Sequence, residues 1–334
     1  MDIMDLINAL PGAIAQGLIW GIMAIGVYIT YKVLDVADLT VDGTMCTGGA
    51  VCAIMMIAGH NVWVSMICAM LAGALAGLLT GIFHVSMGIP AILAGILSQL
   101  GLYSINLKII GKANEALPAH VYDVLVAMKY NKGVPLVKNT IFIVAIFTIV
   151  IIALLYWFFG TALGCSMRAT GSNKKMSRAQ GINTKVNTVI GLMLSNALVA
   201  LASALYTQYQ GFTDINMGRG AIVIGLAAVI IGNVIFERIF KNFALKLLSV
   251  SIGAIVYYIV LQVVIWMGFD TDLLKLLSAI VVAIFLAVPY LKREYVPVIK
   301  NFNKRREAKK NNKLVISQMN KEASLENAKK VGDK

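Results

Sequence analysis

The chain has 334 residues, of which 59% are hydrophobic and only 13% are charged, and its mean hydropathy is +0.81. A soluble domain carries about 25% charged residues, so the composition excludes a globular enzyme with an ordinary water-facing surface. It fits a chain whose main solvent is lipid. The formal net charge of +13 is unevenly spread, because the region 292–334 holds thirteen Lys or Arg and five acidic residues.

Long apolar runs dominate the sequence. A helix that crosses about 30 Å of hydrocarbon needs about 20 apolar residues, and only helices or closed barrels satisfy their backbone in lipid. Barrel strands are about ten residues long and alternate in polarity, so the sequence predicts an all-α, polytopic bundle of about nine (8–10) transmembrane helices within residues 1–291. The runs are 12–33, 43–59, 62–84, 89–110, 139–160, 187–209, 221–240, 244–268 and 272–291.

An acidic segment separates the first two runs. Asp35, Asp38 and Asp42 lie within ten residues, and Gly43, Gly48 and Gly49 follow. One interpretation is an ordinary solvated loop. The other is a helix broken near residues 35–49 that lines a cavity in the membrane, where irregular backbone and a costly buried aspartate would mark a functional site.

Glycines recur every four residues at Gly73, Gly77 and Gly81, and again at Gly17 and Gly21. This spacing lets two membrane helices approach closely. It is compatible with a seam that moves during function and with static packing. Farther along, the apolar residues within 121–128 could form a short interfacial helix in the loop between the fourth and fifth runs.

The loop 161–185 is basic and contains no acidic residue. Cytoplasmic loops carry an excess of Lys and Arg, so this loop and the turn 237–246 are predicted to be cytoplasmic, and the acidic turn 268–272 external. With nine spans, the N-terminus lies outside and the C-terminus in the cytoplasm. The region 292–334 is then a basic cytoplasmic tail that contacts membrane lipid, and we expect no binding to nucleic acid.

The basic loop resembles the cytoplasmic coupling loop of ABC importer permeases of the branched-chain amino acid type. In that family a pattern close to R-A-x-x-x-N-x-x-x-A-x-x-x-G-I-N precedes a long apolar helix. The region 17–43 is similar to the family's first span and the segment after it, with Leu39–Gly43 in place of the family's N-F-A-H-G. The residues that carry the coupling-loop resemblance are Arg168, Ala169, Asn173, Gly181, Ile182 and Asn183.

The resemblance implies a permease subunit in the cell membrane that moves a small solute, an amino acid, by alternating access. Its implied partners are two copies of an ABC ATPase, an external substrate-binding protein and a second permease copy in a homodimer. The T-V-D-G sequence and the chain size are similar to a branch of the family linked to uptake of tryptophan and tyrosine. The residues expected to couple to the ATPase are Arg168, Asn173, Lys174, Ala179, Gly181, Ile182 and Asn183.

The sequence contains no phosphate-binding G-x-x-x-x-G-K-[ST] loop. We therefore expect no enzymatic activity and no cofactor in this chain, with ATP and Mg²⁺ bound by the partner ATPase. The alternative function is an ion-coupled secondary transporter that uses Asp35, Asp38 or Asp42. Polar residues of the spans and of the acidic segment are candidates for the substrate path: Asp35, Asp38, Thr40, Asp42, Gly43, Gln99, Asn196 and Gln208.

Overall fold

The computed structural model describes residues 3–131, 135, 138–236, 239–268, 276–285, 287 and 290. The chain divides into two compact units, 1–282 and 283–334, and the elements described below as far as Trp266 belong to the first. The tail predicted over 292–334 lies outside the described residues.

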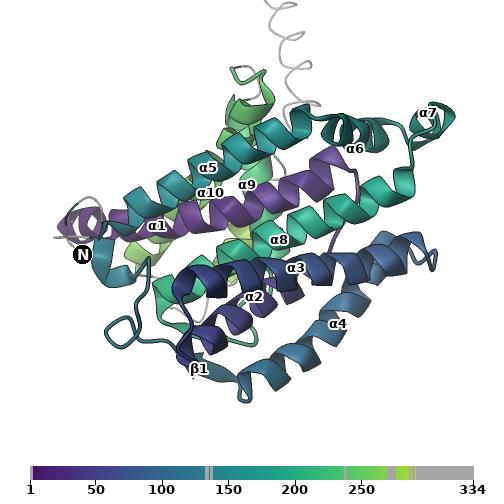
Figure 1. Cartoon of the computed structure of the whole chain (residues 1–334). Helices are drawn as coiled ribbons and strands as arrows, with labels where there is room; N and C mark the ends of the chain where they lie inside the picture. Colours follow the sequence, from purple (N-terminus) through teal and green to yellow (C-terminus); the bar gives the residue numbers. More distant parts are fainter. Residues whose placement is uncertain are drawn as a thin grey trace, which may run out of the picture. The chain divides into compact units, whose positions relative to one another are not determined.

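The described elements are almost all helices (Figure 1). In chain order they are α1 (Ile3–Tyr28), the π-helical turn η1 (Ile29–Val33), α2 (Thr40–Ile57), α3 (Val62–Val85), α4 (Ala91–Ile110), β1 (Asn114–Ala116), the 3₁₀ turn η2 (Met128–Asn131), α5 (Thr140–Gly160), α6 (Ala162–Ser172), α7 (Lys174–Ala179), α8 (Thr184–Gln210), β2 (Phe212–Asp214), α9 (Ala221–Phe236) and α10 (Phe243–Trp266).

Seven helices are long and apolar enough to cross a membrane: α1 with η1, α2, α3, α4, α5, α8 and α10. This confirms the all-α polytopic fold. The predicted runs 221–240 and 272–291 correspond, in the described residues, to the shorter apolar helices Ala221–Phe236 and Leu276–Phe285. Between η1 and α2 the chain is not helical, whereas α2 itself is continuous from Thr40 to Ile57.

Side-chain caps explain several helix boundaries. The side chains of Asn61, Asn139 and Thr161 accept hydrogen bonds from backbone N–H groups in the first turns of α3, α5 and α6. Gly111 and Gly211 end α4 and α8 with φ values of 77° and 79°, in the left-handed region that glycine adopts without a steric penalty. These ends therefore follow from local sequence.

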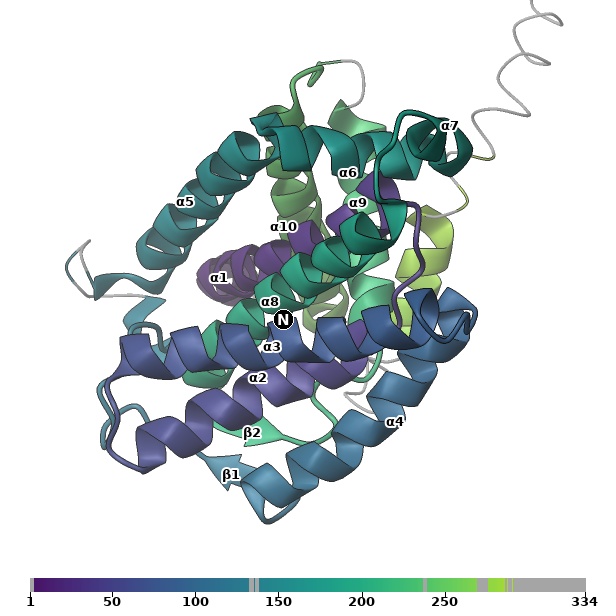
Figure 2. The ribbon, with the colours of Figure 1, turned by 45° about the vertical axis from the view of Figure 1, so that its right-hand side comes forward.

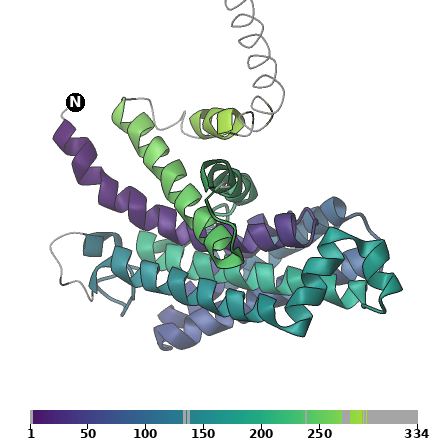
Figure 3. The same ribbon diagram turned by 90° about the horizontal axis from the view of Figure 1, so that it is seen from above.

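The core of the bundle consists of α1, α2 and α8, most of whose residues are buried, whereas most of α3, α4, α5 and α10 is not. Figure 2 shows α8 with α3 and α2 on one side and α1 on the other, and all three pack against it. Figure 3 shows α10 alongside α1, the helix with which it packs most extensively. The outer helices therefore present apolar residues outward, as expected of helices that face lipid.

Glycines bring the backbones of the inner helices together. A side chain at Gly73 or Gly77 of α3 would meet the carbonyl oxygens of Asn196 or Leu192 in α8. A Cβ atom at Gly17 of α1 would lie 2.7 Å from the Cα atom of Ile255 in α10. The predicted close approach at both glycine series is therefore present.

A two-stranded ribbon joins the loops that follow α4 and α8. β1 pairs antiparallel with β2, with Asn114 opposite Asp214, so both loops lie at the same end of the bundle. The short helix considered for residues 121–128 does not form. Val126 is fully buried and Val124 nearly so, so these residues pack inward in an irregular conformation and present no continuous apolar face.

We predict that Gly77→Ala destabilises the bundle by about 1–3 kcal/mol, because the added methyl group has no space against the α8 backbone. Gly101→Ala is the matched control, since a Cβ atom there has nothing within 4 Å. The measurement is the thermal unfolding midpoint of the purified chain in detergent, followed by circular dichroism. Equal midpoints for the two variants would contradict this account of the α3–α8 contact.

Candidate functional site: a protruding basic helix and a buried polar network

The basic loop folds into two short helices. α6 packs against α5, α8 and η1, and it can approach η1 because Gly171 lies against the backbone carbonyl of Val33. The Asn187 amide of α8 donates hydrogen bonds of 3.0 Å to the hydroxyls of Ser166 and Thr170 in α6. α6 is therefore fixed to the bundle.

α7 projects away from the bundle at its end (Figure 1), and its two boundaries are set locally. Asn173 caps its first turn by accepting from the Met176 N–H at 3.0 Å. Gly181 follows the helix with φ of 77°, and Asn183 caps α8 by accepting from the Val186 N–H at 3.2 Å. Three of the predicted coupling residues thus shape the segment.

The surface of α7 is basic and exposed. Its inward residue is Ser177, which is fully buried, and the Arg178 Nε atom donates a 3.0 Å hydrogen bond to the Thr184 hydroxyl. The result is a small, rigidly tethered basic projection. The predicted coupling residue Ile182 is half-buried, and the exposed residues of the segment include Lys174, Lys175, Met176 and Ala179.

Arg168 differs from the other predicted coupling residues. It lies in α6, where its Nη2 atom is 3.3 Å from the Cys165 sulfur and its guanidinium carbon is 5.8 Å from the Phe243 ring centroid. It therefore faces the start of α10, apart from α7.

A continuous hydrogen-bonded network crosses the interior around Asp38, which is buried in the non-helical connection between η1 and α2. The Thr40 N–H donates to Asp38 Oδ1 at 2.9 Å, and the Asn196 amide donates to Asp38 Oδ2 at 2.7 Å. Asn196 Oδ1 in turn accepts from the Thr44 hydroxyl at 2.7 Å.

The network extends through hydroxyl groups into two further helices. The Thr40 and Thr80 hydroxyls lie 2.7 Å apart, and the Thr80 hydroxyl donates to that of Ser98 at 2.7 Å. The network thus joins the start of α2 to α8, α3 and α4. The sequence analysis did not find Thr44, Thr80 or Ser98, because single hydroxyl residues in apolar helices carry no distinguishing spacing.

Asp42 holds a re-entrant segment in place. Its two carboxylate oxygens accept backbone N–H groups of Gly220 and Ile222, each at 3.0 Å, at the start of α9. Cys46 lies against the Asp214 carbonyl oxygen, so the chain from 214 to 220 runs back along α2 into the bundle. α9 then begins at Ala221, the first residue of the predicted run 221–240.

The remaining predicted path residues lie apart from this network. Asp35 is exposed, with φ of 54°. Gln99 is half-buried, and its backbone lies against Gly43. Gln208 is buried near the opposite end of α2, where it accepts the Leu125 N–H at 3.0 Å. Asp38 is therefore buried in the bundle, whereas Asp35 is exposed.

Comparison with known proteins adds independent information. A family model described as "Branched-chain amino acid transport system / permease component" matches residues 10–288. The "Tyrosine transport system permease protein" of Clostridioides difficile (strain R20291) is 34% identical over 304 residues, which cover 90% of this chain and 99% of that protein.

Two further relatives are similar over different lengths. An uncharacterized protein of Rickettsia prowazekii (strain Madrid E) is 35% identical over 289 residues, covering 86% of this chain and 99% of that protein. The "Autoinducer 2 import system permease protein LsrC" of Escherichia coli O9:H4 (strain HS) is 28% identical over 223 residues, covering 66% of this chain and 61% of that protein.

We predict that Asn196→Ala destabilises the folded chain by about 1–3 kcal/mol, because the Asp38 carboxylate and the Thr44 hydroxyl lose a buried partner. Asn233→Ala is the control. Asn233 is half-buried in α9 and has no side-chain hydrogen bond among the described residues. The measurement is the thermal unfolding midpoint of both variants in detergent. An equal decrease of the midpoint in Asn233→Ala would mean that the network makes no specific contribution to stability.

Proposed function

Because the chain belongs to the family of permease components of branched-chain amino acid transport systems, we propose that it is the membrane-spanning half of an ATP-driven importer of an amino acid. An external binding protein delivers the solute, and the helix bundle alternates between outward-open and inward-open states. The observation that carries the coupling mechanism is the protruding, basic α7 with capped ends.

A separate ABC ATPase docks on α7. The exposed Lys174, Lys175 and Met176 supply the contact surface, and the turns at Asn173, Gly181 and Asn183 keep α7 in a fixed orientation, so that movement of the ATPase is passed to α8. ATP and Mg²⁺ bind to the ATPase. Two ATPases related by two-fold symmetry require two permeases, which we assign to two copies of this chain.

The orientation follows from the same contact. With α7 in the cytoplasm, the β1–β2 ribbon lies at the outer end, because α8 runs between them. The N-terminus is then outside, and the loops beside the ribbon face the binding protein. We place the C-terminal tail in the cytoplasm because of its excess of Lys and Arg. The excess of Lys and Arg in 161–185 supports this orientation.

We assign an aromatic amino acid, tyrosine or tryptophan, as the substrate. The support is the 34% identity over nearly the whole length of the C. difficile protein whose name specifies tyrosine transport. The substrate path passes the polar network at Asp38, Thr40 and Asn196, where a buried carboxylate and a buried amide are hydrogen-bonded to each other. Asp42, Gly43, Gln99 and Gln208 flank this path.

Charge reversal on α7 tests the docking. Lys174→Glu combined with Lys175→Glu is expected to weaken association with the ATPase by at least about tenfold, because reversing both charges replaces electrostatic attraction with repulsion. The measurement is co-purification of the ATPase with the tagged permease from membranes. Lys108→Glu is the control, since Lys108 is exposed on α4 near the ribbon. Full association of the double variant would exclude α7 as the docking site.

Reconstitution tests the transport mechanism and the substrate. Vesicles that contain the chain, its ATPase and its binding protein are expected to accumulate labelled tyrosine only when ATP is supplied on the side of the membrane that carries the ATPase. Unlabelled tryptophan should compete with tyrosine better than leucine does. The measurement is filter-trapped radioactivity over time. Uptake by the chain alone under an ion gradient would instead establish the ion-coupled alternative that uses Asp35, Asp38 or Asp42.

A further inference from the structure

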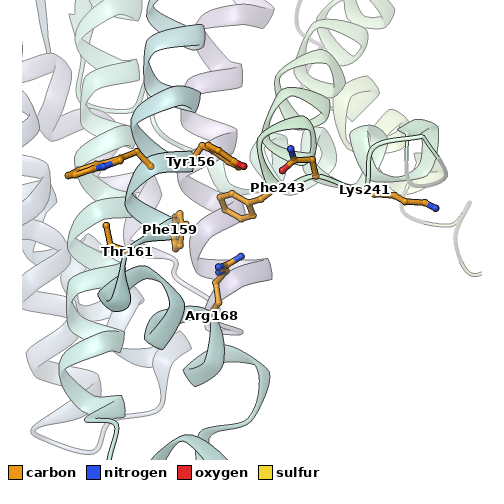
Figure 4. A pocket seen from close by; sticks show the side chains of 9 residues that line it. Tyr156, Phe159, Thr161, Arg168, Lys241 and Phe243 are labelled. Carbon is orange, nitrogen blue, oxygen red and sulfur yellow. The ribbon is translucent and has the colours of Figure 1, made fainter.

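A cavity of about 550 Å³ lies where α5 ends and α10 begins, with α6 beneath it (Figure 4). It is separate from α7 and from the polar network around Asp38. Its walls combine aromatic rings, hydroxyl and amide groups and two cations. The residues that line it are Tyr156, Trp157, Phe159, Gly160, Thr161, Arg168, Lys241, Asn242 and Phe243.

The two cations of the cavity come from segments far apart in the sequence. Figure 4 shows Arg168 directed between Phe159 and Phe243, and Lys241 at the rim beside the start of α10, with its side chain extending away from Arg168. Neither forms an ion pair with a carboxylate in the part of the chain that the structure describes. An arginine held against an aromatic ring, with no acid beside it among the described residues, leaves its remaining N–H donors available to an anion with several oxygens, such as a phosphate.

The cavity lies at the depth where a membrane helix meets water. It surrounds the last turn of α5, a span of 21 residues, and Tyr156 and Trp157 occupy that turn. Tyr and Trp are enriched at this level of the bilayer. Trp157 is 70% exposed, so its ring is available to lipid. An anion that enters the cavity is therefore positioned like a lipid headgroup.

An apolar groove adjoins the cavity at Trp157, which lines both. The groove has a volume of about 420 Å³ and lies between α3, α5 and α8. Along α5 it extends from Phe147 to Phe158, a rise of about 16 Å, close to half of the ~30 Å hydrocarbon core. This is the depth of one leaflet, and therefore the length that an acyl chain needs.

We propose that this cavity binds an anionic phospholipid, with the phosphate held by Arg168 and by Lys241 once its flexible side chain turns inward from the rim, and with an acyl chain lying in the groove beyond Trp157. Basic pockets between transmembrane helices are suited to anionic headgroups. Arg168 then serves the lipid site and the exposed lysines of α7 serve the ATPase, although both belong to one basic loop. The lipid would link α5, α6 and the start of α10.

The test uses the purified full-length chain in mixed micelles that contain phosphatidylglycerol or phosphatidylcholine with brominated acyl chains, which quench tryptophan fluorescence on contact. Brominated phosphatidylglycerol is expected to quench at a lower mole fraction than brominated phosphatidylcholine. Trp157→Phe combined with Trp63→Phe should remove most of that difference, because both tryptophans line the groove. The preference should fall about fivefold for each cation lost in Arg168→Gln and Lys241→Gln.

Two controls separate charge at this site from charge in general. Arg168→Lys keeps the cation and should retain most of the preference, whereas Lys185→Gln removes an exposed cation of α8 outside the cavity and should leave it unchanged. Unfolding midpoints establish that each variant is folded. An undiminished preference for phosphatidylglycerol in the Arg168→Gln, Lys241→Gln double variant would overturn the proposal. A loss of that preference in Lys185→Gln equal to the loss in the cavity variants would also overturn it.

A second arm distinguishes a lipid from a free anion. Inorganic phosphate at matched ionic strength is expected to displace little brominated phosphatidylglycerol, because it cannot occupy the groove. Displacement as effective as that by unlabelled phosphatidylglycerol would overturn the lipid assignment. The same variants in the ATPase co-purification assay should retain the ATPase, and its loss with Arg168→Gln, without loss of the lipid preference, would assign Arg168 to the protein partner.

Discussion

The contact of α8 with the glycine faces of α2 and α3 is the constraint on which the rest of the interior depends. At Gly48, Gly73 and Gly77 the neighbouring helix approaches so closely that a methyl group would collide with the α8 backbone. Helices in lipid gain no hydrophobic free energy from associating with one another, so packing and interhelical hydrogen bonds must hold them. The close approach brings Asn196 within hydrogen-bonding distance of both Asp38 and Thr44.

Two irregular segments can enter the bundle because carboxylates satisfy their backbone. Asp38 accepts the N–H of Thr40 at the start of α2, and Asp42 accepts those of Gly220 and Ile222 at the start of α9. Without such partners, backbone at this depth would leave N–H groups unpaired at a cost of several kcal/mol each. The acids of one short segment thus support the ends of two helices, and the polar interior and the re-entrant segment form one structure.

The basic loop contains two surfaces with different environments. α7 stands clear of the bundle and is suited to a soluble partner, whereas α6 is fixed to α8 through Asn187 and directs Arg168 toward α10. An excess of Lys and Arg identifies which side of the membrane a loop occupies, yet gives no information about which cation faces protein and which faces lipid. That division arises only where α6 packs beneath the ends of α5 and α10.

The sequence by itself determined the membrane class, seven of the spans and the local shape of the basic loop 161–185. These features depend on the length of apolar runs and on residues that act within a few positions, such as Asn173, Gly181 and Asn183. Only the tertiary structure decided that Asp38 is buried while Asp35 is exposed, that Asp42 meets Gly220, and that Arg168 shares a cavity with Lys241. Asp42 and Gly220 are 178 residues apart in the sequence. The two cations of the cavity come from α6 and from the residues just before α10. Residue type and periodicity fix which face of a helix is apolar, whereas the meeting of two polar side chains depends on how closely and at what register the helices pack.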